Sequence, residues 1–393
     1  AVSDAGRGAG EVLDKRHSWG KYLEEGRFKI LKILAVILLV LILAAAGLTF
    51  YVYRSKAMFL PALLGLGRFP QVKKESYYNG DGTFRQATAD DSMAFLMQHP
   101  VFGGYKHMFF NAEDNVLKSI APASYSAFMK AQGREEQLES SLESFNYLTA
   151  QVQQGRAWLL SDLYPEEDVE KDPYKSHLTG MFYQGEEGKP LAIVVPGGGF
   201  ISNVTDCEGY PVAMELHRRG YSVLVLSYPI GKQLGQTEQV KQAEQACREL
   251  VQAVRYLNDH QEQLNINMED FAIFGFSAGG MMTTSYAFAH YADSCHKHEL
   301  PRPTAIFPIY GLDWNVEPLP MDRGLAVFSV VGREDPYGFG MIEEKIPALT
   351  ETLGEENVSI RVYDHLGHGF GLGTETVAKN WLQEAVDFWE AHR

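Results

Sequence analysis

Short, almost wholly apolar runs recur through the second half of the chain and constrain its fold more than any other feature. The apolar runs lie at residues 191–195, 221–228, 271–276, 304–311, 325–332 and 358–365. The stretches between them are long enough for amphipathic helices. Such continuous apolar character is typical of parallel strands that are covered on both faces. The alternation of strands and helices therefore predicts an α/β fold with a doubly wound, mostly parallel sheet.

The stretch between the second and third runs gives the clearest helix prediction. Its apolar residues recur at steps of three and four, which places them on one face of a helix. They are Val240, Ala243, Cys247, Leu250, Val251, Val254 and Leu257. Two final helices are expected at residues 341–353 and 375–391.

The region before the predicted sheet, residues 54–172, is expected to be mainly helical. Apolar residues recur at helical steps from Arg134 until Gly155 stops the pattern. A shorter helix is expected to begin at an Asp90 cap and to end before Pro100. The sequence does not indicate what this region does.

A charged stretch framed by prolines, residues 164–174, has no apolar periodicity and marks the best domain boundary. It predicts that the helical region ends at residue 172. The α/β domain is then expected to span residues 173–393.

Residues 33–53 form an apolar segment of 21 residues without a charged side chain. At about 1.5 Å per residue, a helix of this length matches the roughly 30 Å hydrocarbon core of a bilayer. Basic residues flank it on both sides, and Tyr51 and Tyr53 lie where an interfacial belt is expected. The segment is therefore predicted to be a transmembrane anchor, with the lipid bilayer as its partner.

A cleaved signal peptide is the competing interpretation, because small residues at 44–46 offer a processing site. The long preceding region and the length of the apolar run favour an uncleaved anchor. Positive charges before the segment slightly outweigh those just after it. The positive-inside rule then predicts that residues 1–32 are cytoplasmic and that the bulk of the chain lies outside the cytoplasm.

The overall composition excludes several other classes of function. The net charge of −15 on 393 residues argues against nucleic acid as a partner, and no basic stripe with interleaved aromatics is present. Cys207, Cys247 and Cys295 are odd in number and lack CxxC spacing, which argues against a disulfide framework or a Cys-rich zinc site. Residues 295–299, CHKHE, are expected to form a solvated loop, and residues 79–83, NGDGT, a turn. No metal or organic cofactor is expected.

Ser277 stands between glycines in the segment Gly-Phe-Ser-Ala-Gly, directly after the apolar run at 271–276. In a parallel sheet, a strand, this motif and a helix form a nucleophile elbow. The tight turn needs Gly275 and Gly279 where side chains would collide. It exposes the serine hydroxyl and places the Ala278 N–H at the positive end of the following helix.

A second glycine-rich segment, VVPGGGF at residues 194–200, follows the first apolar run. Consecutive glycines let backbone N–H groups approach a ligand closely. Together with Ala278, they could bind the oxyanion that forms when a serine attacks an ester carbonyl.

An acid and a histidine follow the serine in the order that a Ser-acid-His triad of this fold requires. Asp335 lies just beyond the run at 325–332, and His368 lies just beyond the run at 358–365. A serine hydroxyl needs a base to remove its proton, and an acid must orient that base. Glu334 and His365 are the neighbouring alternatives. The shorter side chain of Asp335 suits a turn before proline, and the glycine-flanked loop of His368 is free to reach Ser277.

These motifs together resemble the α/β-hydrolases. The segments PGGGF, EGYPVA, LSYPIG, GFSAGG, GREDP and GHGFG, within residues 175–393, are similar to the bacterial acetyl-esterase and acetyl-xylan-esterase-like branch, which is related to the hormone-sensitive-lipase group. Pro196 replaces the histidine often found before the glycines, and LSYPIG replaces a commoner Asn-Tyr-Arg run.

The resemblance implies a role for each matching residue. Ser277 would be the nucleophile, Asp335 the acid and His368 the base. The N–H groups of Gly198, Gly199 and Ala278 would form the oxyanion hole.

The leading hypothesis is a membrane-anchored extracytoplasmic serine esterase that acts on short acyl esters. The resemblance favours acetyl esters of a carbohydrate or a similar polar alcohol. An acyltransferase would use the same residues with an acceptor other than water. A catalytically inactive hydrolase fold used as a binding module is the alternative outside enzymes.

Overall fold

The computed structural model describes residues 67–231, 239–288, 299–312 and 319–393. The chain divides into two units, residues 1–60 and 61–393, and all described residues lie in the second. The predicted anchor at residues 33–53 falls outside the described part. Within that part, no helix combines the length and the apolar character needed to cross a membrane.

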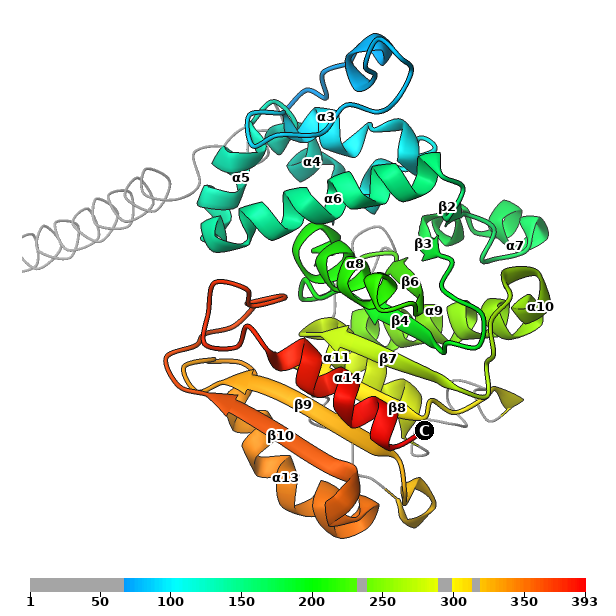
Figure 1. Cartoon of the computed structure of the whole chain (residues 1–393), viewed down its shortest axis with the longest axis vertical. Helices are drawn as coiled ribbons and strands as arrows, with labels where there is room; N and C mark the ends of the chain where they lie inside the picture. The colour runs from blue at the N-terminus through cyan, green and yellow to red at the C-terminus, as the bar shows by residue number, and fades with distance from the viewer. Residues whose placement is uncertain (1–66, 232–238, 289–298, 313–318) are drawn as a thin grey trace, which may run out of the picture. The chain divides into compact units, whose positions relative to one another are not determined.

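An eight-stranded sheet forms the centre of this unit (Figure 1), with the strand order β10-β9-β8-β7-β4-β6-β3-β2. The strands are β2 (Ala157–Leu160), β3 (Thr179–Tyr183), β4 (Leu191–Val195), β6 (Ser222–Ser227), β7 (Phe271–Phe276), β8 (Ala305–Ile309), β9 (Ala326–Gly332) and β10 (Val358–Tyr363). The short strands β1 (Asn111–Ala112) and β5 (Ser202–Asn203) pair separately.

The six strands predicted from the sequence are the six parallel strands of this sheet. The prediction of a mostly parallel α/β sheet is therefore confirmed. Strands β2 and β3 were not predicted, and they extend the sheet antiparallel at the β6 edge. Their apolar runs are short, so they lack the continuous apolar character that identified the other strands.

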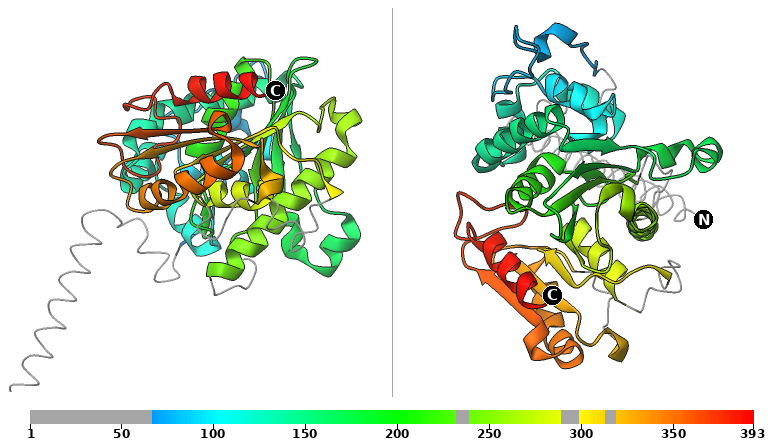
Figure 2. Two further views of the ribbon diagram at one scale, coloured as in Figure 1. Left: turned by 90° about the horizontal axis from the view of Figure 1, so that it is seen from below. Right: turned by 45° about the vertical axis from the view of Figure 1, so that its right-hand side comes forward.

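Helices cover both faces of the sheet, which explains why its parallel strands are apolar on both sides. Figure 2 shows α8 and α14 on one face, and α9, α11 and α13 on the other. Leu191, Ile193 and Val195 of β4 belong to one buried cluster with α9 residues such as Leu250 and Val254. Alternate residues of a strand point to opposite faces of the sheet, so the buried side chains of Ala192 and Val194 lie on the face opposite α9.

The helices that connect or cover the strands are α7 (Glu166–Lys171), α8 (Tyr210–Arg218), α9 (Gln239–Asp259), α10 (Gln261–Leu264), α11 (Ala278–Ala287), α13 (Phe339–Leu353) and α14 (Trp381–Ala391). The predicted apolar stripe lies on α9, where the described members from Ala243 to Leu257 pack toward the sheet. The last helix begins at Trp381 and not at residue 375, because turns occupy residues 374–379.

The described part of the preceding region contains α3 (Met93–Met97), α4 (Asp114–Ile120), α5 (Tyr125–Gln132) and α6 (Leu138–Gln153). Figure 1 shows α6 alongside α8, with α3, α4 and α5 beyond it. The predicted boundary stretch 164–174 lies within the compact unit, because β2 precedes it and pairs with β3, which follows it. The helical region is thus continuous with the sheet.

The start of α3 corrects one local prediction. Ser92, and not Asp90, caps this helix, since the Ser92 side chain accepts a hydrogen bond from the Phe95 N–H. The chain first makes a turn in which the Asp91 N–H donates to the Thr88 carbonyl at 3.1 Å. This turn delays the helix by two residues.

An uncharged histidine lies in the core of the helical region. His99 is fully buried, and its ring contacts Tyr77, Phe84, Phe95 and Phe145. Its Nδ1 accepts from the Val101 N–H, which requires a ring nitrogen without a proton. Burial, with a smaller effect of the Arg85 charge, lowers the pKa of His99 from 6.5 to about 3.

We expect His99 to make the stability of this unit depend on pH. The unfolded chain takes up a proton near pH 6.5, whereas the folded chain does not, so the contribution of His99 to stability falls as the pH drops below 6.5. His99→Phe should therefore gain about 2 kcal/mol of unfolding free energy relative to the wild type between pH 6.5 and pH 5. Urea unfolding at the two pH values measures this difference. The exposed His365→Gln variant serves as the control, and an equal pH dependence for His99→Phe and wild type would contradict the assignment.

Candidate active site

Ser277 lies in the tight turn between β7 and α11. Its backbone has φ 50° and ψ −116°, a conformation that residues other than glycine seldom adopt. A Cβ atom on Gly275 would lie 2.2 Å from the Gly279 carbonyl oxygen, and one on Gly279 would lie 2.1 Å from the Val195 carbonyl oxygen. The two glycines of the motif are therefore required by close backbone approach.

Ser277, His368 and Asp335 form a continuous chain of hydrogen bonds. The Ser277 Oγ lies 2.8 Å from His368 Nε2, and His368 Nδ1 lies 2.8 Å from Asp335 Oδ2. The Asp335 side chain is fully buried, whereas 23% of the His368 side chain is exposed. A buried acid that holds Nδ1–H leaves Nε2 free to accept the serine proton.

The loop after β9 fixes the Asp335 carboxylate from its other side. Asp335 Oδ1 accepts hydrogen bonds from the backbone N–H groups of Tyr337 and Gly338, each at 2.8 Å. Both carboxylate oxygens therefore have defined partners, and the oxygen directed at the imidazole cannot rotate away freely.

The neighbouring candidates Glu334 and His365 form a separate pair. His365 Nδ1 lies 3.1 Å from Glu334 Oε1, and both side chains are mostly exposed. The apolar run predicted at 358–365 included His365 at its end. Strand β10 ends at Tyr363, however, so His365 lies in the turn after the strand. Neither residue belongs to the hydrogen-bond chain of Ser277.

The triple-glycine loop lies directly against the serine turn. A Cβ atom on Gly197 would lie 2.8 Å from the Ser277 Cβ. Among the hydrogen bonds described for this part of the chain, none uses the N–H of Gly198, Gly199 or Ala278. Ala278 is the first residue of α11, where the N–H has no acceptor within the helix. These groups are available to a ligand oxygen.

A family model matches the part of the chain around this site. Residues 182–311, which include the glycine loop and Ser277, match the family model BD-FAE. The sheet around the site has the topology of the α/β-hydrolase fold. The strand order, the serine turn and the order of Ser277, Asp335 and His368 in the chain all fit that fold.

A curated relative of this chain is endo-1,4-beta-xylanase B from Butyrivibrio fibrisolvens. It is 34% identical over 117 residues, which are 30% of this chain and 18% of the relative. The match thus spans less than one fifth of the relative's length.

Solved structures with a similar arrangement include two further hydrolases. The acetyl ester-xyloside bifunctional hydrolase from Caldicellulosiruptor lactoaceticus is 20% identical, with a TM-score of 0.45 over 58% of this chain and 94% of that chain. MGS-M1, an alpha/beta hydrolase enzyme from a Medee basin deep-sea metagenome library, is 19% identical, with a TM-score of 0.44. The match covers 55% of this chain and 92% of that chain.

Two residues that the sequence analysis did not select lie beside the hydrogen-bond chain of Ser277, His368 and Asp335. The ring of Tyr310 packs edge-on against His368, with 4.9 Å between the ring centroids. Glu208 is buried and accepts hydrogen bonds from the Tyr310 hydroxyl and from the Gly197 N–H. Tyr310 directly follows β8, and residues at the carboxyl ends of parallel strands meet at such a site. That position was a usable signal for Tyr310, whereas no comparable signal marks Glu208.

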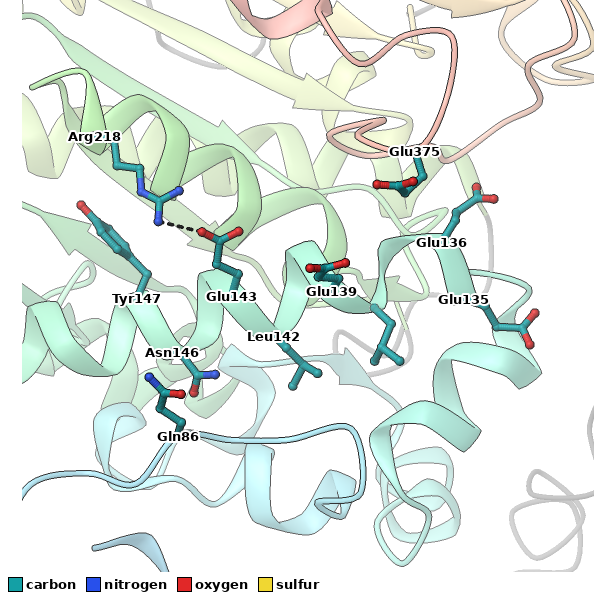
Figure 3. Close-up of a pocket in the computed structure, with 11 residues that line it drawn as sticks. Gln86, Glu135, Glu136, Glu139, Leu142, Glu143, Asn146, Tyr147, Arg218 and Glu375 are labelled. Atoms are coloured by element: carbon teal, nitrogen blue, oxygen red, sulfur yellow. Dashed lines mark hydrogen bonds and ion pairs between the residues drawn. The ribbon is translucent and has the colours of Figure 1, made fainter. Parts of the chain in front are cut away.

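An open groove lies away from these residues, along α6. The groove has a volume of about 840 Å³. Figure 3 shows its lining side chains, among them Arg218 of α8, which is paired with Glu143 of α6. Arg218 Nη2 lies 2.8 Å from Glu143 Oε1. Glutamates dominate its lining, and Ser277, His368 and Asp335 do not contribute to it. Within the described residues, no group of three or more His, Cys, Asp and Glu side chains is arranged to hold a metal ion.

Proposed function

We propose that this protein is a serine esterase that hydrolyses short-chain acyl esters. The observation that supports it most strongly is the hydrogen-bond chain from Ser277 Oγ through the His368 imidazole to the buried Asp335 carboxylate. This arrangement supplies a nucleophile, a base and an acid that orients the base.

The first half of the proposed reaction forms an acyl-enzyme. Ser277 Oγ attacks the ester carbonyl carbon while His368 Nε2 takes the hydroxyl proton. The carbonyl oxygen becomes an oxyanion, which the N–H groups of Gly198, Gly199 and Ala278 would stabilise. His368 then gives its proton to the departing alcohol as the bond between the acyl carbon and the alcohol oxygen breaks.

The second half returns the enzyme to its starting state. Water loses a proton to His368 Nε2 and attacks the acyl carbon on Ser277. The oxyanion forms again at the same N–H groups. When it collapses, Ser277 Oγ leaves, takes the proton back from His368, and a carboxylic acid is released.

The proposed substrate is an acetyl or similarly short acyl ester on a carbohydrate or a related polar alcohol. The resemblance of the motifs to acetyl esterases supports the acyl group. The relative named endo-1,4-beta-xylanase B supports a polysaccharide context. We further propose that residues 33–53 anchor the enzyme in a membrane with the hydrolase domain outside the cytoplasm, because this uncharged segment is flanked by basic residues.

The triad assignment is tested by labelling with a fluorophosphonate probe and by ester hydrolysis. Ser277→Ala should abolish labelling and lower kcat by about 10³-fold or more, because no nucleophile remains. His368→Ala and Asp335→Asn should each lower kcat by about 10²-fold or more.

Matched controls for these variants lie next to them in the chain. His365→Ala and Glu334→Gln change an exposed pair outside the hydrogen-bond chain, so kcat should stay within about twofold of the wild type. Labelling of Ser277→Ala, or stronger inactivation by the control variants, would refute the assignment.

The acyl preference is tested with p-nitrophenyl esters of increasing chain length. We expect kcat/KM to be highest at about two to four carbons and to fall by eight, with each methylene changing discrimination by about 1–3 kcal/mol. A maximum at eight carbons or more would indicate a lipase. Product analysis with added alcohols separates hydrolysis from acyl transfer, since an acyltransferase would form new esters.

The membrane topology is tested on intact cells that express the chain with an N-terminal epitope. Protease added outside should cut the hydrolase domain and leave the epitope intact, because residues 1–32 are expected to be cytoplasmic. Loss of the epitope with a protected hydrolase domain would reverse the orientation. A mature N-terminus near Gly47 would show cleavage in place of anchoring.

A further inference from the structure

Glu208 links two loops of the active site that are far apart in the chain. It lies in a short π-helical turn, Thr205–Gly209, and only 2% of it is exposed. Its Oε2 accepts from the Gly197 N–H at 2.8 Å, and its Oε1 accepts from the Tyr310 hydroxyl at 2.9 Å. Both oxygens of one buried carboxylate are therefore engaged, each by a different loop.

The first of these loops carries the glycines of the proposed oxyanion hole. A Cβ atom on Gly197 would lie 2.8 Å from Glu208 Oε2 and 2.8 Å from Ser277 Cβ, so the loop backbone is held between the two residues. Gly198 and Gly199 follow immediately, with φ values of 131° and 62°. Glycine residues allow a wide range of backbone angles, so Gly198 and Gly199 do not fix their own N–H directions. The hydrogen bond at Gly197 therefore helps to set where these two N–H groups point.

The second loop carries His368. The Tyr310 hydroxyl, besides donating to Glu208, accepts from the Gly371 N–H at 3.2 Å. The Tyr310 ring packs edge-on against both His368 and Phe370. Tyr310, which Glu208 holds through its hydroxyl, thus contacts three residues of the loop that positions the imidazole.

The helical region completes this arrangement from the other side. Gln137, at the start of α6, donates from Nε2 to the Gly369 carbonyl at 2.9 Å and is itself buried. Arg134 Nη2 would lie 3.7 Å from a Cβ atom on Gly369, and its charge interacts with Glu208. A positive charge beside a buried carboxylate offsets the cost of its desolvation.

We propose that Glu208 is a positioning residue that ties the oxyanion loop to the histidine loop through Tyr310, and that Arg134 and Gln137 of the helical region secure the same junction. This inference deepens the proposed esterase function and rests on it. Glu208 does not contact Ser277 Oγ or the His368 imidazole in the described hydrogen bonds, so its effect on the reaction is indirect.

The physical consequence concerns kcat more than substrate binding. Catalytic groups must stay within about 0.5 Å of their productive positions. When the residues that hold them are lost, the rate falls although the substrate-binding surface remains. Glu208→Gln keeps the shape of the side chain. The glutamine amide has only one acceptor oxygen, so it cannot accept hydrogen bonds from both the Gly197 N–H and the Tyr310 hydroxyl. One of the two loops therefore loses its hydrogen bond.

The test compares Glu208→Gln, Tyr310→Phe and the double variant in the full-length chain with p-nitrophenyl acetate. Each single variant should lower kcat by about 10- to 100-fold and change KM by less than about threefold. The kcat of the double variant should be only slightly lower than that of the less active single variant. Both changes break the same link, so their effects are not additive. Glu249→Gln, a buried glutamate on α9 outside the site, should leave kcat within about twofold.

A second pair of variants tests the contribution of the helical region. Gln137→Leu removes the bond to the Gly369 carbonyl and should lower kcat by about tenfold, with KM nearly unchanged. Gln151→Leu changes another buried glutamine on α6 that lies 14 residues further along the helix, about 21 Å away. It should leave kcat unchanged.

Fluorophosphonate titration counts the competent sites in every sample and separates positioning from folding. If kcat per labelled site in Glu208→Gln and Gln137→Leu equals that of the wild type, these residues only stabilise the fold and the inference is refuted. Fully additive losses in the double variant would show that Glu208 does not act through Tyr310. If the wild-type protein neither labels nor hydrolyses any ester, the proposed function fails, which is a different result.

Discussion

The close packing of backbone around Ser277 is the constraint on which the rest of the site depends. The Ser277 N–H donates to the Ile309 carbonyl at 2.9 Å, and a Cβ atom on Gly311 would lie 2.0 Å from the Ser277 carbonyl oxygen. On the other side, Gly279 leaves no room for a side chain beside Val195. The turn is therefore held between β4 and β8, and its unusual backbone conformation persists because its neighbours fix it.

Contacts with the His368 loop explain why the helical region and the sheet form one compact unit. A serine turn alone does not position a histidine that lies about 90 residues later in the chain; the His368 loop needs its own supports. Tyr310 and Asp335 provide two of them from the segments that follow β8 and β9, and Gln137 provides another from the start of α6. Buried charges at this junction, Asp206 and Glu208, lie near Arg134. Burial is also the main reason why the pKa of Asp206 rises to about 6.

Prediction from the sequence was most successful where one physical effect dominated. Parallel strands covered on both faces are continuously apolar, so six of them could be identified. Strand β3 has only a short apolar run, and its place beside β6 depends on pairing across the sheet edge. The start of α3 was missed for a local reason, because Asp90 and Ser92 are both good caps and only the preceding turn selects Ser92.

The sequence by itself determined the order of strands along the chain, the serine turn and the identity of the acid and base candidates. These features follow from local residue types: glycines where backbones collide, apolar runs where both faces are covered, and polar residues just after strands. The sequence favoured His368 over His365 as the base, and the tertiary structure brings His368 to Ser277. Only the tertiary structure revealed that Glu208, Tyr310 and Gln137 support the site. Such contacts join residues up to 232 positions apart. A pattern along the chain carries no record of which side chains folding brings within hydrogen-bond distance.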